Sequence, residues 1–184
     1  ENQGPAAARN RAVASSGGEL IAFLDADDLW RPDKLARQVA FLDEHPTCAL
    51  VHGEVDVIDE SGQPLCEHYD QTQGRVVLRG LCASELLKHS VIHMPTVIER
   101  RRHFEEVGGF DEGLRYAEDY LHWIRLAVHG HAFGYIDEPL ALYRWRADSL
   151  AREGTTDVRR SESLLCVYGG LLRDAAVRSQ LTAT

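Results

Sequence analysis

The feature that most constrains the fold of this chain is a short apolar run that ends in a cluster of carboxylates. Residues 20–24 read LIAFL and are followed at once by Asp25-Ala26-Asp27-Asp28. A strand-length run with no polar position is typical of a strand covered on both faces, as at the centre of a parallel sheet. The sequence therefore predicts a central parallel strand whose carboxyl end carries acidic side chains, which is where ligands bind in open α/β folds.

Helical and extended patterns alternate around this run, which predicts an α/β architecture. We expect helices at residues 5–15, 32–45, 81–89, 118–129 and 161–180, and further strands at 48–58, 95–99 and 133–136. Within the second helix, Leu35, Val39 and Leu42 recur on one face, so we expect that face to pack on the core. The turn signal at 60–63 predicts a hairpin or a surface loop, and Arg100-Arg101-Arg102 is interpreted as a solvated loop rather than a basic patch.

Composition narrows the class of protein. The 184 residues carry 20 Lys plus Arg against 29 Asp plus Glu, a net charge of −9, which disfavours a nucleic-acid binder that depends on phosphate attraction. No apolar run approaches the roughly 18 residues that cross a bilayer, and residues 1–11 contain no signal-peptide core. We expect a protein that is cytoplasmic, or cytoplasmic and peripherally associated with the inner face of the membrane. The four cysteines lack a C-x-x-C pair and are expected to be free thiols.

Two acidic groups, a cluster of three and a pair, are candidates for chemistry. The carboxylates of Asp25, Asp27 and Asp28 are close enough in sequence to repel one another unless a cation lies among them, and hard oxygen ligands of this kind suit Mg²⁺ or Mn²⁺. The alternative is that they only cap the following helix, with Asp28 as an N-cap or a turn residue. The second group, Glu118-Asp119, falls in the first turn of a helix, where the dipole alone favours negative charge, so capping is the stronger reading of that pair in isolation.

Several separate blocks agree in order and spacing with the family 2 glycosyltransferases, which have the GT-A fold. The blocks are Asn2-x-Gly4, Ala8-Arg9-Asn10, residues 18–35 around D-A-D-D-L-W, Val107-Gly108-Gly109-Phe110-Asp111, Glu118-Asp119-Tyr120-x-x-Trp123, and Glu138-Pro139-Leu140-Ala141-x-Tyr143-Arg144. The resemblance implies an α/β, partial GT-A domain over residues 1–150, with a mixed central sheet flanked by helices. Residues 151–184 are expected to form a helical extension packed on it.

The resemblance also implies roles for the acidic residues in a transfer of sugar from a nucleotide-diphospho-sugar donor to an acceptor hydroxyl. Asp25 is expected near the ribose or the sugar, and Asp27 on the metal that bridges the diphosphate, with Asp25 as a further metal ligand. Asp119 is the expected general base, and Glu118 the second choice, since neighbouring helix residues point about 100° apart. Attack from the face opposite the leaving group inverts the anomeric configuration.

Four further side chains are implicated by the same resemblance. Arg9 and Asn10 are expected to lie near the nucleotide or to support the acidic loop, with a helix-surface role equally open for Arg9. Arg144 and Arg146 are expected to contact donor phosphates. The family often has a histidine where Arg146 stands, so a histidine metal ligand at this position is excluded.

The resemblance begins part-way through the family's domain. The first strands of the family, of the V-S-V-I-I-P type, have no counterpart here, and they form the pocket for the nucleotide base. We therefore expect weak donor binding by these residues alone, and association of copies through an exposed strand edge near Phe23. The donor would be a UDP-, GDP- or dTDP-sugar, and the acceptor a glycan, a lipid or another hydroxyl compound.

Two other functions remain open from the sequence. One is a metal- or sugar-binding fragment of such an enzyme that has no catalytic activity. The other is a haloacid-dehalogenase-like phosphohydrolase, which also ends an apolar strand in D-x-D. That class normally has Thr or Val two residues after the second Asp, where this chain has Leu29.

Overall fold

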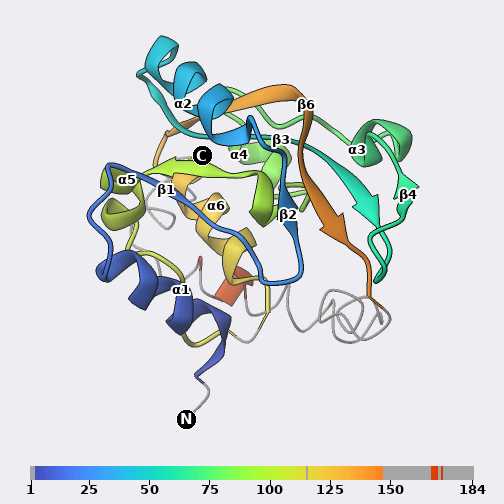
Figure 1. Cartoon of the computed structure of the whole chain (residues 1–184). Coiled ribbons are helices and arrows are strands. Elements are labelled where there is room, and N and C mark those ends of the chain that lie inside the picture. The colour runs from blue at the N-terminus through green and yellow to red at the C-terminus, as the bar shows by residue number, and fades with distance from the viewer. Residues whose placement is uncertain (1–2, 115, 147–166, 170, 172–184) are drawn as a thin grey trace.

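A computed structural model describes residues 3–114, 116–146, 167–169 and 171 of the chain (Figure 1). The helices are α1 (Gly4–Ala14), α2 (Lys34–Glu44), α3 (Tyr69–Thr72), α4 (Ala83–Leu86), α5 (Arg101–Glu106) and α6 (Glu118–Val128), with a 3₁₀ turn η1 (Met94–Thr96). The strands are β1 (Leu20–Ala22), β2 (Leu29–Trp30), β3 (Cys48–Ile58), β4 (Pro64–Cys66), β5 (Ile98–Arg100) and β6 (Ala132–Arg144).

The strands form one mixed sheet, as expected. Their order is β1-β5-β3-β6-β2, and β4 pairs separately with β3 to make the hairpin predicted at 60–63. Among the strands that the structure describes, only the β3–β6 pair is parallel, while β1–β5, β3–β5 and β2–β6 are antiparallel. The 25–28 loop therefore runs from β1, at one end of this order, to β2, at the other end beside β6.

The prediction that residues 20–24 form a central parallel strand is wrong. β1 spans only three residues, is antiparallel to β5 and lies at one end of the strand order. Its continuous apolar character has a different cause, because Ile21 and Phe23 pack into the core on one face of the sheet while Leu20 and Ala22 pack into the core on the other. Cover on both faces, rather than a central position, explains the run.

Two hydrophobic cores lie on opposite faces of the sheet. The larger one is formed with α1, α5 and α6, and includes Ala6, Phe104, Leu121 and Trp123. The smaller one lies under α2 and contains Leu42, Cys48, Val51 and Ile98. Figure 1 shows α2 on one side of the sheet, with α1 and α6 on the other.

Helix α2 packs on a face other than the predicted one. Leu35 and Val39 are exposed, whereas Lys34 and Gln38 are fully buried together with Leu42. The buried face is polar because the backbone beneath it needs donors: Gln38 Nε2 donates to Val51 O at 2.9 Å and to Thr96 O at 2.7 Å. Burial also lowers the pKa of Lys34 to about 7. Apolar periodicity missed this face because its contacts are hydrogen bonds.

Glycine allows α2 to approach the sheet closely. A Cβ at Gly134 in β6 would lie 2.2 Å from the Phe41 ring of α2. No side chain other than hydrogen fits that distance, so Gly134 sets how near the helix can lie.

The remaining elements differ from prediction mainly in their bounds. The helix expected at 81–89 is the single turn α4, the strand expected at 95–99 becomes η1 followed by β5, and the strand expected at 133–136 extends to Arg144. Strand β2 was not predicted. The expected helix at 161–180 and the boundary at 150/151 lie outside the described residues, apart from 167–169 and 171, which are helical. Among the helices that the structure describes, none has the length and apolar character needed to cross a bilayer.

The arginine run at 100–102 is neither a solvated loop nor a basic patch. Arg100 ends β5 and donates to the carbonyls of Cys48 and Leu42, at 3.0 and 2.7 Å. Arg101 begins α5 and donates to Val13 O at 3.0 Å, which ties α5 to α1. The two guanidinium groups therefore satisfy backbone carbonyls near the ends of α1 and α2 and at the start of β3.

Candidate active site

Arg9 brings the two acidic motifs together. Its Nη2 donates to Asp25 Oδ1 at 2.6 Å, and its Nη1 to Glu118 Oε1 at 2.5 Å. Arg9 comes from α1, Asp25 follows β1, and Glu118 is the first residue of α6, so one side chain joins three elements. Burial by itself lowers the pKa of Arg9, but the carboxylates of Asp25 and Glu118 raise it overall, which keeps the guanidinium charged. The helix-surface alternative for Arg9 is therefore wrong.

The acidic pair at the start of α6 has an environment suited to proton transfer. Burial raises the pKa of Glu118, and the neighbouring Asp119 raises it further, while Arg9 opposes both effects. Burial likewise raises the pKa of Asp119, whose Oδ1 accepts the Tyr120 N–H at 2.7 Å. A carboxylate with a raised pKa is a stronger base, which is the property that abstraction of a hydroxyl proton requires.

Asp28 is buried and links the acidic loop to the end of β6. Its Oδ1 accepts the backbone N–H of Arg144 at 2.8 Å, and its side chain belongs to no helix cap, because α2 begins only at Lys34. The N-cap alternative for Asp28 is therefore wrong, whereas the turn alternative is confirmed, because the backbone N–H of Asp28 donates to Asp25 O at 3.1 Å. Burial, together with the nearby carboxylates of Asp27 and Asp25, raises the pKa of Asp28 to about 6.

The side chain of Arg144 also holds the acidic loop in place. Nε donates to Asp27 O at 2.7 Å and Nη1 to Asp59 O at 2.8 Å. These contacts hold the backbone of the D-x-D segment against β6 and the β3–β4 turn. Arg146, two residues on, is exposed. Contact of either arginine with a donor phosphate stays a prediction, and for Arg144 the structure adds a positioning role.

Asn10 acts on the bend that precedes α6. Its side-chain amide pairs with the backbone of Phe110 in both directions, donating to O at 2.9 Å and accepting from N at 3.0 Å. Gly109 makes this approach feasible, since its φ is +68° and a Cβ there would lie 3.0 Å from Asn10 Oδ1. Asn10 thus supports the segment that leads to Glu118, and a contact with the nucleotide stays a prediction.

Sequence patterns missed a polar and aromatic group near the acidic loop. His93 Nε2 lies 3.0 Å from Asp70 Oδ1, and the His93 ring lies 5.8 Å from the ring of Tyr143, which is next to Arg144. The Tyr69 and Trp145 rings meet edge to face at 6.5 Å. The residues come from separate segments with no shared motif, so only the tertiary fold brings them together.

Comparison with known proteins shows which family this chain is part of. A family model described as "Glycosyltransferase like family 2" matches residues 1–168. The chain belongs to this family. Among its relatives, an uncharacterized glycosyltransferase of Rickettsia felis is 33% identical over 144 residues, covering 78% of this chain and 23% of the relative. The succinoglycan biosynthesis protein ExoO of Rhizobium meliloti is 32% identical over 126 residues, covering 65% of this chain and 36% of the relative.

Solved structures show the fold of this family-2-like glycosyltransferase chain to be GT-A. The mannosyltransferase PcManGT of Pyrobaculum calidifontis, in complex with GDP-Man and Mn²⁺, has a TM-score of 0.66 at 21% identity, over 95% of this chain and 45% of that one. TarS 1-349 of S. aureus with UDP-GlcNAc has a TM-score of 0.67 at 19% identity, over 94% of this chain and 48% of that one. The chain thus spans less than half the length of these proteins.

Proposed function

We propose that this chain carries the metal-binding and base residues of an inverting glycosyltransferase, which moves a sugar from a nucleotide-diphospho-sugar donor to an acceptor hydroxyl. The observation that carries the proposal is the Arg9 bridge between Asp25 and Glu118. It brings a D-x-D segment and an E-D segment, far apart in sequence, to one place. Membership of the family and the GT-A fold support the same conclusion.

The carboxylates of the D-x-D segment fit a divalent cation. Arg9 engages Asp25 through Oδ1, and within the described ranges no hydrogen bond or ion pair is made by the half-buried Asp27 carboxylate. Hard carboxylate oxygens at the end of a strand suit Mg²⁺ or Mn²⁺. Asp27, with Asp25, would hold the cation, which when bound neutralises the charge that develops on the departing diphosphate.

Asp119 is the better candidate for the base. Glu118 is committed to Arg9, whereas Asp119 Oδ1 has a single backbone donor. In the proposed reaction Asp119 accepts the proton of the acceptor hydroxyl as that oxygen attacks the anomeric carbon. Arg9 keeps the E-D segment next to the D-x-D segment and, by its charge, holds the pKa of Asp119 below the value that burial alone would produce.

The donor and the acceptor are proposed as chemical classes. PcManGT and TarS were solved with GDP-Man and UDP-GlcNAc, so a nucleotide-diphospho-sugar is the proposed donor. The proposed acceptor is a hydroxyl of a glycan, a lipid or a related compound, met in the cytoplasm or at the membrane periphery. Family membership leaves no support for the phosphohydrolase hypothesis.

Replacement of one D-x-D carboxylate tests the proposal. In the intact protein, Asp27→Ala should abolish metal-dependent turnover of nucleotide sugar, with an unchanged circular dichroism spectrum. Asp43→Ala, an exposed carboxylate on α2, is the matched control and should retain activity. Turnover by Asp27→Ala that persists with EDTA present would refute the metal role. Absence of turnover in the wild-type intact protein would favour the alternative function, a metal- or sugar-binding module without catalytic activity.

A further inference from the structure

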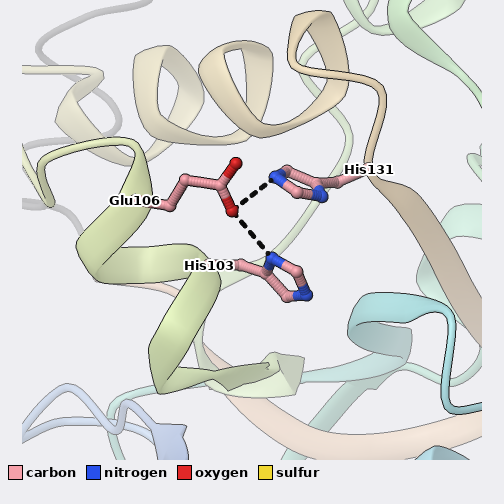
Figure 2. Close-up of side chains that lie close together, drawn as sticks. All are labelled: His103, Glu106 and His131. Carbon is pink, nitrogen blue, oxygen red and sulfur yellow. Dashed lines mark hydrogen bonds and ion pairs between the residues drawn. The ribbon is translucent and has the colours of Figure 1, made fainter.

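Three metal-ligating side chains meet at the end of the sheet remote from the acidic loop. They are His103 and Glu106 of α5, and His131, which immediately precedes β6. One ligand atom from each lies within 4.8 Å of the other two. Figure 2 shows both imidazole rings directed toward the same carboxylate oxygen of Glu106. The proposed function uses none of these residues.

We propose that His103, Glu106 and His131 form a binding site for a divalent transition-metal ion of the zinc class. Two imidazoles and one carboxylate are a donor set that suits Zn²⁺, with a fourth position left for water. This donor set differs from the all-oxygen D-x-D segment, which suits the harder ions Mg²⁺ and Mn²⁺.

The two distances to Glu106 agree with a tetrahedral ion. Ligand atoms about 2.1 Å from a tetrahedral Zn²⁺ lie about 3.4 Å from one another. In the structure, Glu106 Oε2 lies 3.1 Å from His103 Nδ1 and 3.2 Å from His131 Nε2. Small side-chain movements would therefore bring the three atoms to coordination distance.

His131 Nε2 provides a second, independent observation. This atom is shielded from solvent, yet its contact with Glu106 lacks the geometry of a hydrogen bond. A buried ring nitrogen without a hydrogen bond is costly. A metal ion between His131 Nε2 and the Glu106 carboxylate would satisfy this nitrogen, whose contact with Glu106 is short but is not a hydrogen bond.

The site is partly enclosed but can be reached by an ion. The side chains of His103 and His131 are 14% and 15% exposed, whereas that of Glu106 is 49% exposed. The carboxylate therefore faces the solvent and the imidazoles lie behind it. His129 is also near enough to interact electrostatically with both Glu106 and His131.

Metal binding would require one proton to move. Arg102 Nε donates to His103 Nε2 at 3.0 Å, so in the metal-free form Nδ1 carries the ring proton and donates it to Glu106. For Nδ1 of a neutral imidazole to bind a metal, the ring proton must move to Nε2 by exchange with solvent, and Arg102, which is exposed, must then turn away because Nε2 no longer accepts its hydrogen bond. Arg102 therefore competes with the metal.

The site is separate from the proposed active site. His131 precedes the first residue of β6, whereas Arg144, which braces the acidic loop, is the last. The 13 residues of β6 between them span roughly 40 Å, and the 11 residues of α6, which separate Glu118 from His131, span about 16 Å. A metal here would join α5 to the residue just before β6, since Glu106 and His131 already lie 3.2 Å apart, and would act on stability rather than on the reaction.

Zinc titration of the metal-free 184-residue chain tests the proposal. We expect one Zn²⁺ bound in competition with a chelating dye in the wild-type chain and in Asp27→Ala, with Mg²⁺ failing to displace it. His131→Ala and Glu106→Gln should weaken binding at least about tenfold. His45→Ala, which removes an exposed histidine just after the end of α2, should leave binding unchanged.

Two further measurements test the zinc site even if His131→Ala or Glu106→Gln folds poorly. Arg102→Ala, which removes the competing donor, should bind Zn²⁺ at least as tightly as the wild type. A Zn²⁺ concentration about a hundredfold above Kd should raise the Tm of the wild type by about 5 °C, and that of His131→Ala not at all. Absence of Zn²⁺ binding in the folded wild type, or equal binding in His131→Ala, would overturn the proposal.

Discussion

The backbone N–H of Arg144 donates to the buried carboxylate of Asp28 across 2.8 Å. The contact joins the end of β6 to the loop that carries Asp25 and Asp27, so the position of the proposed metal ligands depends on a residue more than a hundred positions away in the sequence. Because Asp28 is only 4% exposed, its charge state also affects the stability of the fold.

Asp28 makes stability fall as the pH rises. Its pKa is about 6 in the folded chain, against an ordinary value of 3.8, so the folded state holds a proton that the unfolded state releases first. The contribution is fully present below pH 3.8 and is lost as the pH rises through about 6. It amounts to about 2–3 kcal/mol of the free energy of unfolding.

Urea unfolding at pH 4.5 and pH 7.5, in EDTA, measures this effect. Asp28→Asn keeps an oxygen acceptor for Arg144 and does not titrate, so the loss of stability between the two pH values should be smaller in the variant. Equal losses in variant and wild type would show that Asp28 is not the responsible group.

Asp119→Asn should separate donor binding from chemistry. The amide has nearly the same shape but cannot accept the proton, so kcat in the intact protein should fall about 10²- to 10⁴-fold, with donor affinity retained. Steady-state kinetics and calorimetry with the nucleotide sugar measure the two quantities. A larger loss of kcat in Glu118→Gln would reverse the two roles, and a loss of affinity alone would assign Asp119 to binding.

Arg9 should be a positioning residue whose effect appears in the pH profile. Removal of its charge in Arg9→Ala should raise the pKa of Asp119 and shift the acidic limb of the kcat profile to higher pH. Loss of the bridge should also lower kcat about ten- to a hundredfold. Arg9→Lys keeps the charge but cannot contact both carboxylates in the same way. It should return the acidic limb to its wild-type pH but restore only part of kcat. An unshifted limb in Arg9→Ala would leave Arg9 with a purely structural role.

The outer edge of β1 should promote association of this chain. Within the described residues β1 pairs with β5 alone, and Leu24, which follows β1, is 45% exposed. Phe23 is buried beside Phe104 and Phe110, so contact at this edge would involve backbone groups and Leu24 rather than the Phe23 ring. Light scattering should show a dimer or larger species, and Leu24→Lys should shift it toward monomer. A clean wild-type monomer would contradict this prediction.

Local patterns in the sequence predicted much of the secondary structure. Proline near the first turn and the glycine pair at 17–18 predicted α1, and the apolar spacing after Glu118 predicted α6. The motifs also led to Asp25, Asp27, Glu118 and Asp119 as the residues to examine. These features depend on neighbours within about one or two helical turns, so the sequence alone was sufficient for them.

The tertiary structure decided what those residues contact. The sequence did not predict that Arg9 would bridge Asp25 and Glu118, that Lys34 and Gln38 would be buried in place of Leu35 and Val39, or that β1 would lie at the end of the sheet. It also gave no sign that His131 would meet α5. Each of these outcomes is a contact between segments distant in the chain. Hydrophobic periodicity records only whether a face is apolar, whereas hydrogen bonds and ion pairs between elements depend on how the elements are placed in space.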